Sequence, residues 1–126
     1  MDWRDTPLFD DDGYPTEAVL RDIKEWTCTD PVTGTWNNER LIGLLEHVRA
    51  LWYYPDYFTD EWKDPDLYDH ITEGRVGVYK VSTAGWSGNE SLIDAMEKNV
   101  LFWHKTWFST RRGGHYVFRV EFEEGE

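Results

Sequence analysis

Apolar residues recur at helical spacing in two segments of the first half of the chain. The first segment follows Thr16, a candidate N-cap, and ends near Cys28. The second follows Asn37 or Asn38, either of which can cap a helix, and it ends before Pro55. Its apolar stripe consists of Leu41, Leu44, Leu45, Val48, Leu51 and Trp52. These patterns predict two helices that each bury one face.

Alternating apolar residues predict three strands in the last third of the chain. Their ranges are 75–82 (RVGVYKVS), 101–109 (LFWHKTWFS) and 115–122 (HYVFRVEF). A helix between the first two strands is expected to open at Ser87 with a capping box, in which the Ser87 hydroxyl accepts from the backbone N–H of Glu90 and the Glu90 carboxylate accepts from the N–H of Ser87. Two arginines followed by two glycines predict a tight hairpin between the last two strands.

These elements predict a two-layer α+β fold. In it, a small antiparallel or mixed three-stranded sheet from the C-terminal third packs against about three helices. If the strand at 75–82 pairs with the strand at 115–122, the strand order is 75–82, 115–122, 101–109. The helical connection between the first two strands along the chain is then expected to be right-handed.

The chain is expected to form a single domain over residues 1–126. Residues 1–15 are predicted to be an irregular acidic arm, and residues 123–126 a frayed tail. Residues 53–74 interleave aromatic residues with acids and keep neither a helical nor a strand period. They are expected to form a long ordered loop, which is either functional or a lid that only covers the core.

Composition adds a surplus of aromatic residues and an acidic first half. The 8 tryptophans, 7 tyrosines and 6 phenylalanines carry more ring surface than a small core easily hides, so some are expected at a ligand groove or a partner surface. The formal net charge is -12, and the acidic excess lies in residues 1–73, because residues 74–126 carry equal numbers of acids and bases. An acidic surface repels phosphate, which argues against direct binding of nucleic acid and favours a basic partner.

Few motifs point to a membrane, a metal or a cofactor. No apolar run reaches the roughly 20 residues that span a bilayer, so no membrane partner is expected. The single cysteine, Cys28, allows no intramolecular disulfide and favours a reducing compartment. The four histidines lack the spacing of a metal site, and no phosphate-loop or dinucleotide-binding motif is present. The sequence therefore predicts no metal and no cofactor, and it identifies no catalytic residue.

Two polar segments could together hold a small ligand. The candidate residues are Trp86, Ser87 and Asn89 in the first segment, and Arg111, Arg112, His115 and Tyr116 in the second. The second segment offers guanidinium, imidazole and phenol groups that could bind a carboxylate or a phosphate. For a ligand to bind between residues 85–90 and 111–116, the two segments must meet in one concave site.

Four short segments resemble a set of small proteins encoded in the genomes of tailed phages and prophages. They are Asp12-Gly13-Tyr14-Pro15-Thr16, Leu51-Trp52-Tyr53-Tyr54-Pro55-Asp56, Ser82-Thr83-Ala84-Gly85-Trp86-Ser87-Gly88-Asn89-Glu90 and Arg112-Gly113-Gly114-His115-Tyr116. The resemblance implies a phage accessory protein that acts in the cytoplasm of the bacterial host. It supplies no catalytic residues.

The sequence favours a non-enzymatic phage accessory protein that binds a host or phage protein through an acidic, aromatic-rich surface. A homodimer is also compatible with the surplus of rings. Two alternatives stay open. One is a small-ligand or nucleotide-binding protein, with or without enzymatic activity, whose site lies between residues 85–90 and 111–116. The other is an inhibitor that imitates DNA with its acidic half.

Overall fold

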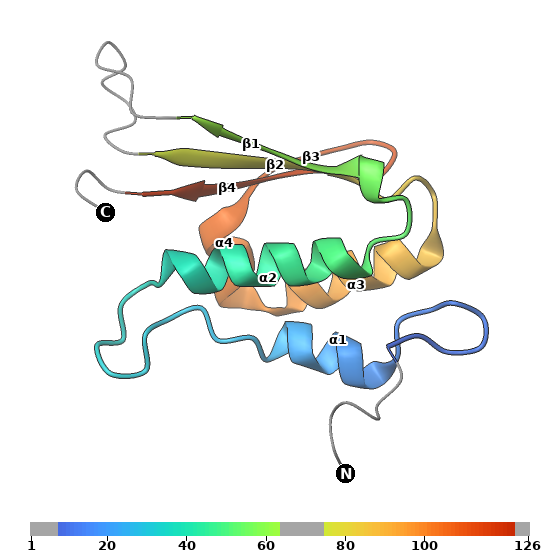
Figure 1. Ribbon diagram of the computed structural model, residues 1–126, viewed down its shortest axis with the longest axis horizontal. Coiled ribbons are helices and arrows are strands. Elements are labelled where there is room, and N and C mark those ends of the chain that lie inside the picture. The colour runs from blue at the N-terminus through green and yellow to red at the C-terminus, as the bar shows by residue number, and fades with distance from the viewer. Residues whose placement is uncertain (1–7, 64–74, 123–126) are drawn as a thin grey trace.

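The computed structural model describes residues 8–63 and 75–122, which form helices on one face of an antiparallel sheet (Figure 1). The elements in chain order are α1 (Glu17–Lys24), α2 (Asn38–Leu51), the 3-10 turn η2 (Pro55–Tyr57), β1 (Phe58–Lys63), β2 (Val76–Ser82), α3 (Ser87–Lys98), α4 (Val100–Thr106), β3 (Trp107–Arg111) and β4 (His115–Glu121). The predicted α+β class is therefore confirmed.

The sheet has the order β1-β2-β4-β3, and every neighbouring pair of strands is antiparallel. The order predicted for the last three strands is confirmed, because β4 lies between β2 and β3. The described part of the sheet has four strands rather than three. The additional strand, β1, extends the sheet beyond β2 and pairs Phe58 with Val81.

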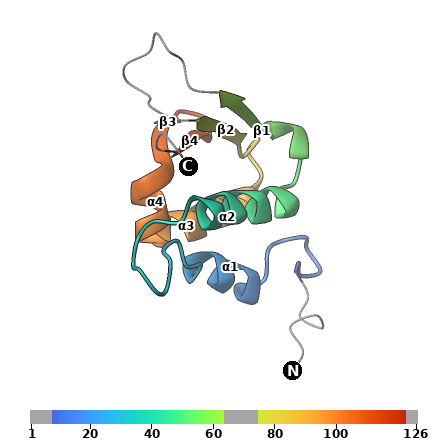
Figure 2. The same cartoon turned by 60° about the vertical axis from the view of Figure 1, so that its left-hand side comes forward.

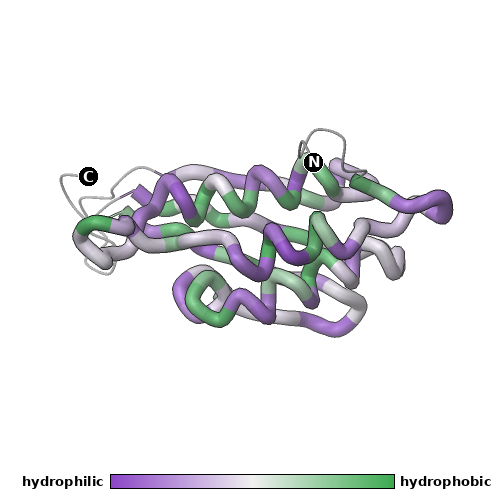
Figure 3. The backbone as a smooth tube through the Cα atoms, turned by 90° about the horizontal axis from the view of Figure 1, so that it is seen from below, coloured by the Kyte–Doolittle hydropathy of each residue, from purple (hydrophilic) through white to green (hydrophobic). Residues whose placement is uncertain are grey.

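The helices occupy two levels below the sheet. Figures 1 and 2 both show α2 and α3 directly beneath the strands and α1 on the far side of these two helices. Hydrophobic and hydrophilic positions alternate along the helices when the molecule is seen from the side of α1 (Figure 3). The fold thus has a second helical level that the predicted two-layer arrangement lacked.

Strand β1 corrects the interpretation of residues 53–74 as one long loop. Phe58, Asp60 and Trp62 share the face that points to the helices, and Phe58 is fully buried. Asp60 accepts a hydrogen bond from the guanidinium of Arg49 on α2 at 2.8 Å, so a paired acid occupies a position where an apolar residue is expected. Because Asp60 is polar, the sequence of β1 does not show the alternation of apolar and polar residues that identifies a strand. Residues 64–74 of the predicted loop lie outside the described residues.

The predicted strand at 101–109 is wrong over most of its length, because α4 occupies Val100–Thr106 and only β3 is extended. Asn99 caps this helix by accepting a hydrogen bond from the backbone N–H of Phe102 at 3.3 Å. Its side-chain amide also donates to the carbonyls of Ile23 (2.9 Å) and Trp26 (3.0 Å), which lie at the end of α1. These partners are remote in sequence, so local alternation does not reveal the helix.

The ends of the other helices agree with the sequence except in two details. Asn37 caps α2 by accepting from the N–H of Arg40 at 3.1 Å, as predicted. Helix α1 ends at Lys24, before Cys28. The capping box at Ser87 is absent: Ser87 is already helical, and Trp86 is the N-cap without a side-chain hydrogen bond. The N–H of Glu90 instead bonds to the carbonyl of Trp86 at 3.1 Å.

His47 on α2 makes stability dependent on pH. Its Nε2 atom is buried without a hydrogen-bond partner among the described residues, and its ring lies 5.2 Å from that of Trp26. Burial lowers the pKa of His47, an effect that the nearby Asp22 carboxylate only partly offsets. The unfolded chain therefore binds a proton at His47 more tightly than the folded protein does. Above about pH 6.5 the free energy of unfolding is unaffected by this group, and it decreases as the pH falls below that value.

We therefore expect His47→Gln to remove part of the loss of stability at acid pH. The free energy of unfolding, measured by urea denaturation at several values between about pH 7.5 and 5.5, should fall more steeply for the wild type than for His47→Gln. Equal slopes for the two proteins would contradict the role given to this side chain.

Candidate binding surfaces

Three exposed tyrosines follow α2 and form what we call the tyrosine row: Tyr53, Tyr54 and Tyr57, with 54%, 48% and 52% of their surface exposed. The rings touch in sequence. The centroids of Tyr53 and Tyr54 are 4.4 Å apart, those of Tyr54 and Tyr57 6.1 Å, and both pairs meet edge to face. Ring pairs of this geometry attract one another, so the three side chains support each other although they face solvent.

The backbone of the tyrosine row is held in an uncommon conformation. Tyr54 has φ 67° and ψ 71°, in the left-handed region that bulky residues rarely adopt. The following Pro55 disfavours a right-handed helical conformation at Tyr54 and starts the turn η2. The carbonyl of Tyr54 accepts a hydrogen bond from the N–H of Tyr57 at 2.9 Å. Strain of this kind persists where the surrounding structure imposes it, and it is concentrated at functional sites.

The side chain of Asn89 on α3 holds the backbone at the start of the tyrosine row. Its side chain is 1% exposed and bonds both backbone groups of Tyr53: Oδ1 accepts from the N–H at 3.0 Å, and Nδ2 donates to the carbonyl at 2.8 Å. Nδ2 also lies 3.3 Å from the carbonyl of Thr83. The polar atoms of Asn89 therefore hold the tyrosine row in place.

An acidic turn lies beside the tyrosine row. Asp10 organises it, because Oδ1 of this residue accepts hydrogen bonds from the N–H groups of Asp12 and Tyr14, both at 2.9 Å. Asp11 and Asp12 are exposed at its tip. The ring of Tyr14 stacks on Trp86 at 5.2 Å, and Trp86 in turn lies 5.3 Å from Tyr53. This chain of rings joins the acidic turn to the tyrosine row.

A cavity of about 610 Å³ opens between these elements, and we call it the acidic cavity. Its walls include Phe9, Asp11, Asp12, Tyr53, Trp86 and Asn89. Asp11 and Asp12 supply carboxylates, and Phe9, Tyr53 and Trp86 supply rings, so the cavity combines negative charge with apolar surface.

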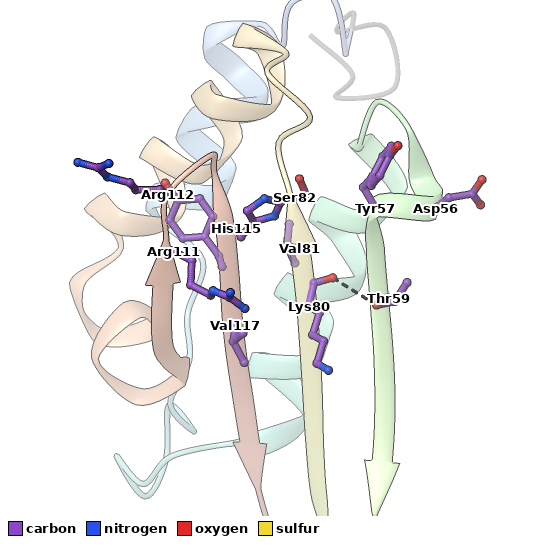
Figure 4. Close-up of a pocket in the computed structure, with 11 residues that line it drawn as sticks. Asp56, Tyr57, Thr59, Lys80, Val81, Ser82, Arg111, Arg112, His115 and Val117 are labelled. Carbon is purple, nitrogen blue, oxygen red and sulfur yellow. Dashed lines mark hydrogen bonds between the residues drawn. The ribbon is translucent and has the colours of Figure 1, made fainter.

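A second cavity, of about 680 Å³, lies on the face of the sheet that points away from the helices, and we call it the basic cavity. It is lined by Asp56, Tyr57, Thr59, Lys80, Val81, Ser82, Arg111, Arg112, His115, Tyr116 and Val117. Figure 4 shows Arg111 and His115 extending over the sheet, while the guanidinium of Arg112 and the carboxylate of Asp56 are directed outward. The end of the tyrosine row, Tyr57, forms part of its rim.

The structure separates the residues that the sequence grouped into one ligand site. Trp86 and Asn89 line the acidic cavity, whereas Arg111, Arg112, His115 and Tyr116 line the basic cavity; Ser87 lines neither. Thr83, two residues before the first segment, donates its N–H to the carbonyl of Gly114 in the second segment at 3.0 Å. The two segments therefore lie near one another, but their candidate residues line different cavities.

Tyr116 and Cys28 have environments that restrict their chemistry. Tyr116 faces the helices and packs edge to face on Trp103. Burial, and after it the carboxylates of Glu97 and Glu90, raises the pKa of Tyr116. Cys28 is 2% exposed, and burial raises the pKa of its thiol to about 11, which suits a packing residue better than a nucleophile.

Sequence reasoning missed several residues that line the cavities, including Tyr57, Thr59 and Ser82. The alternation of β2 signals that Lys80 and Ser82 share a face, away from the buried Tyr79 and Val81. No local signal shows that Ser82 pairs with His115, because that pairing depends on the register between β2 and β4.

Within residues 8–63 and 75–122, no three His, Cys, Asp or Glu side chains are grouped so that they could hold a metal ion. None of the helices in this part of the chain has the length and apolar character needed to cross a membrane. No known family, curated protein or solved structure matches the chain.

Proposed function

We propose that this protein is a non-enzymatic binding module that recognises a basic segment of another protein through the tyrosine row and the acidic turn. The observation that carries the proposal is the strained and exposed Tyr54, which stands between two further exposed tyrosines. Tyrosine is enriched among the residues that dominate binding energy, because it offers a large rigid surface with a polar tip at low entropic cost.

Electrostatics indicate the chemistry of the partner. Asp11 and Asp12 are exposed beside the rings, and Asp56 is exposed within η2. Lysine and arginine side chains can bind carboxylates and can also lie over tyrosine faces, so a basic segment would use both features of this surface. The net charge of -12 would also attract such a partner over longer distances at low salt.

The source of the partner rests on the sequence resemblance to small phage-encoded proteins, which supports a host or phage protein in the bacterial cytoplasm. Imitation of DNA by the acidic half has less support, because two of the acids in that half share a local cation. Arg49 lies 2.8 Å from Asp60 and 3.6 Å from Glu46.

Tyr54→Gly tests the proposal with little disturbance of the fold. Glycine adopts the left-handed conformation without penalty, so this variant removes the ring and relieves the strain at once. We expect its affinity for short Lys- and Arg-rich peptides, selected from a displayed library against the wild type, to fall by about tenfold or more. Fluorescence anisotropy measures the affinity, and binding should weaken as salt is raised.

Val32→Ser provides the control, because Val32 is 91% exposed and belongs to neither cavity. It should bind the selected peptides as the wild type does. The proposal fails if the library yields no saturable binder or if Tyr54→Gly retains full affinity. Sedimentation of the protein alone distinguishes a second copy of this chain as the occupant of the same surface.

A further inference from the structure

The basic cavity gathers basic side chains from three strands. Lys80 comes from the inner strand β2, Arg111 is the last residue of β3, and His115 is the first of β4. The register brings them together: Arg111 pairs with His115 across the hairpin, and His115 pairs with Ser82, two residues after Lys80. Since paired residues project to the same side of a sheet, these groups share its open face.

The cations of this cavity have no acidic partners in the described part of the chain. Ion pairs within 4.0 Å engage Arg49, Lys98 and Arg119, but not Lys80, Arg111 or Arg112. The hydrogen bond at this site is made by the backbone of Lys80, whose carbonyl accepts from the Thr59 hydroxyl at 3.4 Å (Figure 4). The one acid that lines the cavity, Asp56, directs its carboxylate away from it. The charged heads are therefore available to a ligand.

The negative charge of the whole molecule does not cancel this local positive field. At physiological ionic strength, exposed charges more than about 8 Å apart are largely screened from one another. An anion in the cavity therefore responds mainly to the guanidinium, ammonium and imidazole groups that line it. Guanidinium groups bind phosphate with two parallel hydrogen bonds, and an ammonium group adds a point charge.

The size and lining of the cavity indicate more than a bare anion. A volume of about 680 Å³ falls within the range of sites for drug-sized ligands. The half-exposed ring of Tyr57 stands at the rim, and Val117 on β4 supplies apolar surface. The hydroxyl of Ser82 adds a polar group that can donate or accept a hydrogen bond.

We propose that the basic cavity binds a phosphorylated small molecule of nucleotide size. Its phosphate lies among Lys80, Arg111 and His115, and its ring packs against Tyr57. The inference does not rest on the proposed protein-binding function, because its phosphate contacts lie in a different cavity of the opposite charge; Tyr57 alone is shared with the tyrosine row.

Titration with AMP, pyrophosphate and adenosine, followed by calorimetry and by the backbone amide resonances of β2 and β4, tests this inference. AMP and pyrophosphate should bind saturably, and adenosine should bind at least about tenfold more weakly than AMP. Lys80→Gln and Arg111→Gln should each weaken AMP about tenfold. Tyr57→Ala should weaken AMP but not pyrophosphate, which separates the ring contact from the phosphate contact.

Lys98→Gln is the matched control, because it removes the same charge from an exposed site on α3, where Lys98 pairs with Asp94 at 2.9 Å. It should leave AMP binding unchanged, as should Val32→Ser, whose side chain is 91% exposed and lines neither cavity. The inference is overturned if AMP and pyrophosphate show no saturable binding up to about 10 mM, or if Lys98→Gln weakens binding as much as Lys80→Gln does. Circular dichroism confirms that each variant is folded.

Discussion

Phe118→Ala is expected to lower the free energy of unfolding by about 3–5 kcal/mol, a large share of the roughly 5–15 kcal/mol that stabilises a small domain. Phe118 is fully buried on the helix side of β4, in the middle of the strand order. Its ring lies 5.5 Å from that of Trp103 and 6.1 Å from that of Phe102. Truncation would leave a cavity between β4 and α4 that rigid strands cannot close.

Urea denaturation followed by tryptophan fluorescence measures this effect. Phe108→Ala is the control, because Phe108 lies on the neighbouring strand β3 and is 56% exposed. It should cost about 1 kcal/mol or less. A loss of equal size in the two variants would show that Phe118 is not central to the core.

Asn89→Ala is expected to lower the free energy of unfolding by about 2–4 kcal/mol, because it removes the hydrogen bonds of a buried amide to the N–H and carbonyl of Tyr53 and to the carbonyl of Thr83. The same change releases the backbone of the tyrosine row. Affinity for the selected basic peptides should therefore fall as well, measured where the variant is still folded by circular dichroism.

Asn99→Ala separates these two effects. Asn99 is also a buried amide with three hydrogen bonds, but its partners are Ile23, Trp26 and Phe102, which line neither cavity. We expect a similar loss of stability with peptide affinity unchanged. If both variants bind the peptides as the wild type does, Asn89 does not position the binding surface.

The regular elements with an uninterrupted period could be predicted from the sequence. In β4, large apolar residues recur at every second position, Tyr116, Phe118 and Val120, and in α2 the leucine stripe continues for the whole helix. Strand β1 could not be recognised, because Asp60 occupies an inward position whose partner, Arg49, belongs to another element. The sequence predicts a strand where α4 lies, because a dense run of aromatic and β-branched residues favours strands. The residue that caps the helix, Asn99, stands outside this run.

The candidate site likewise contains residues that could be predicted from the sequence and residues that could not. The tight hairpin predicts that Arg111 and His115 are neighbours, and the structure places both on the basic cavity. Lys80 and Tyr57 join them only through the pairing of strands far apart in the chain. Trp86 and Asn89 do not line the basic cavity with these residues. The ring of Trp86 lies against that of Tyr53, and the side chain of Asn89 bonds to the backbone of Tyr53.

The pairing of Asp60 with Arg49 also bears on whether the edge of the sheet can pair with another chain. Strand β1 ends the described strand order, so its outer backbone groups could template another strand. An inward carboxylate on such a strand, followed by the exposed Glu61 and Lys63, disfavours the dry edge-to-edge contact on which ordered aggregates depend. Partners would then engage side chains rather than extend the sheet.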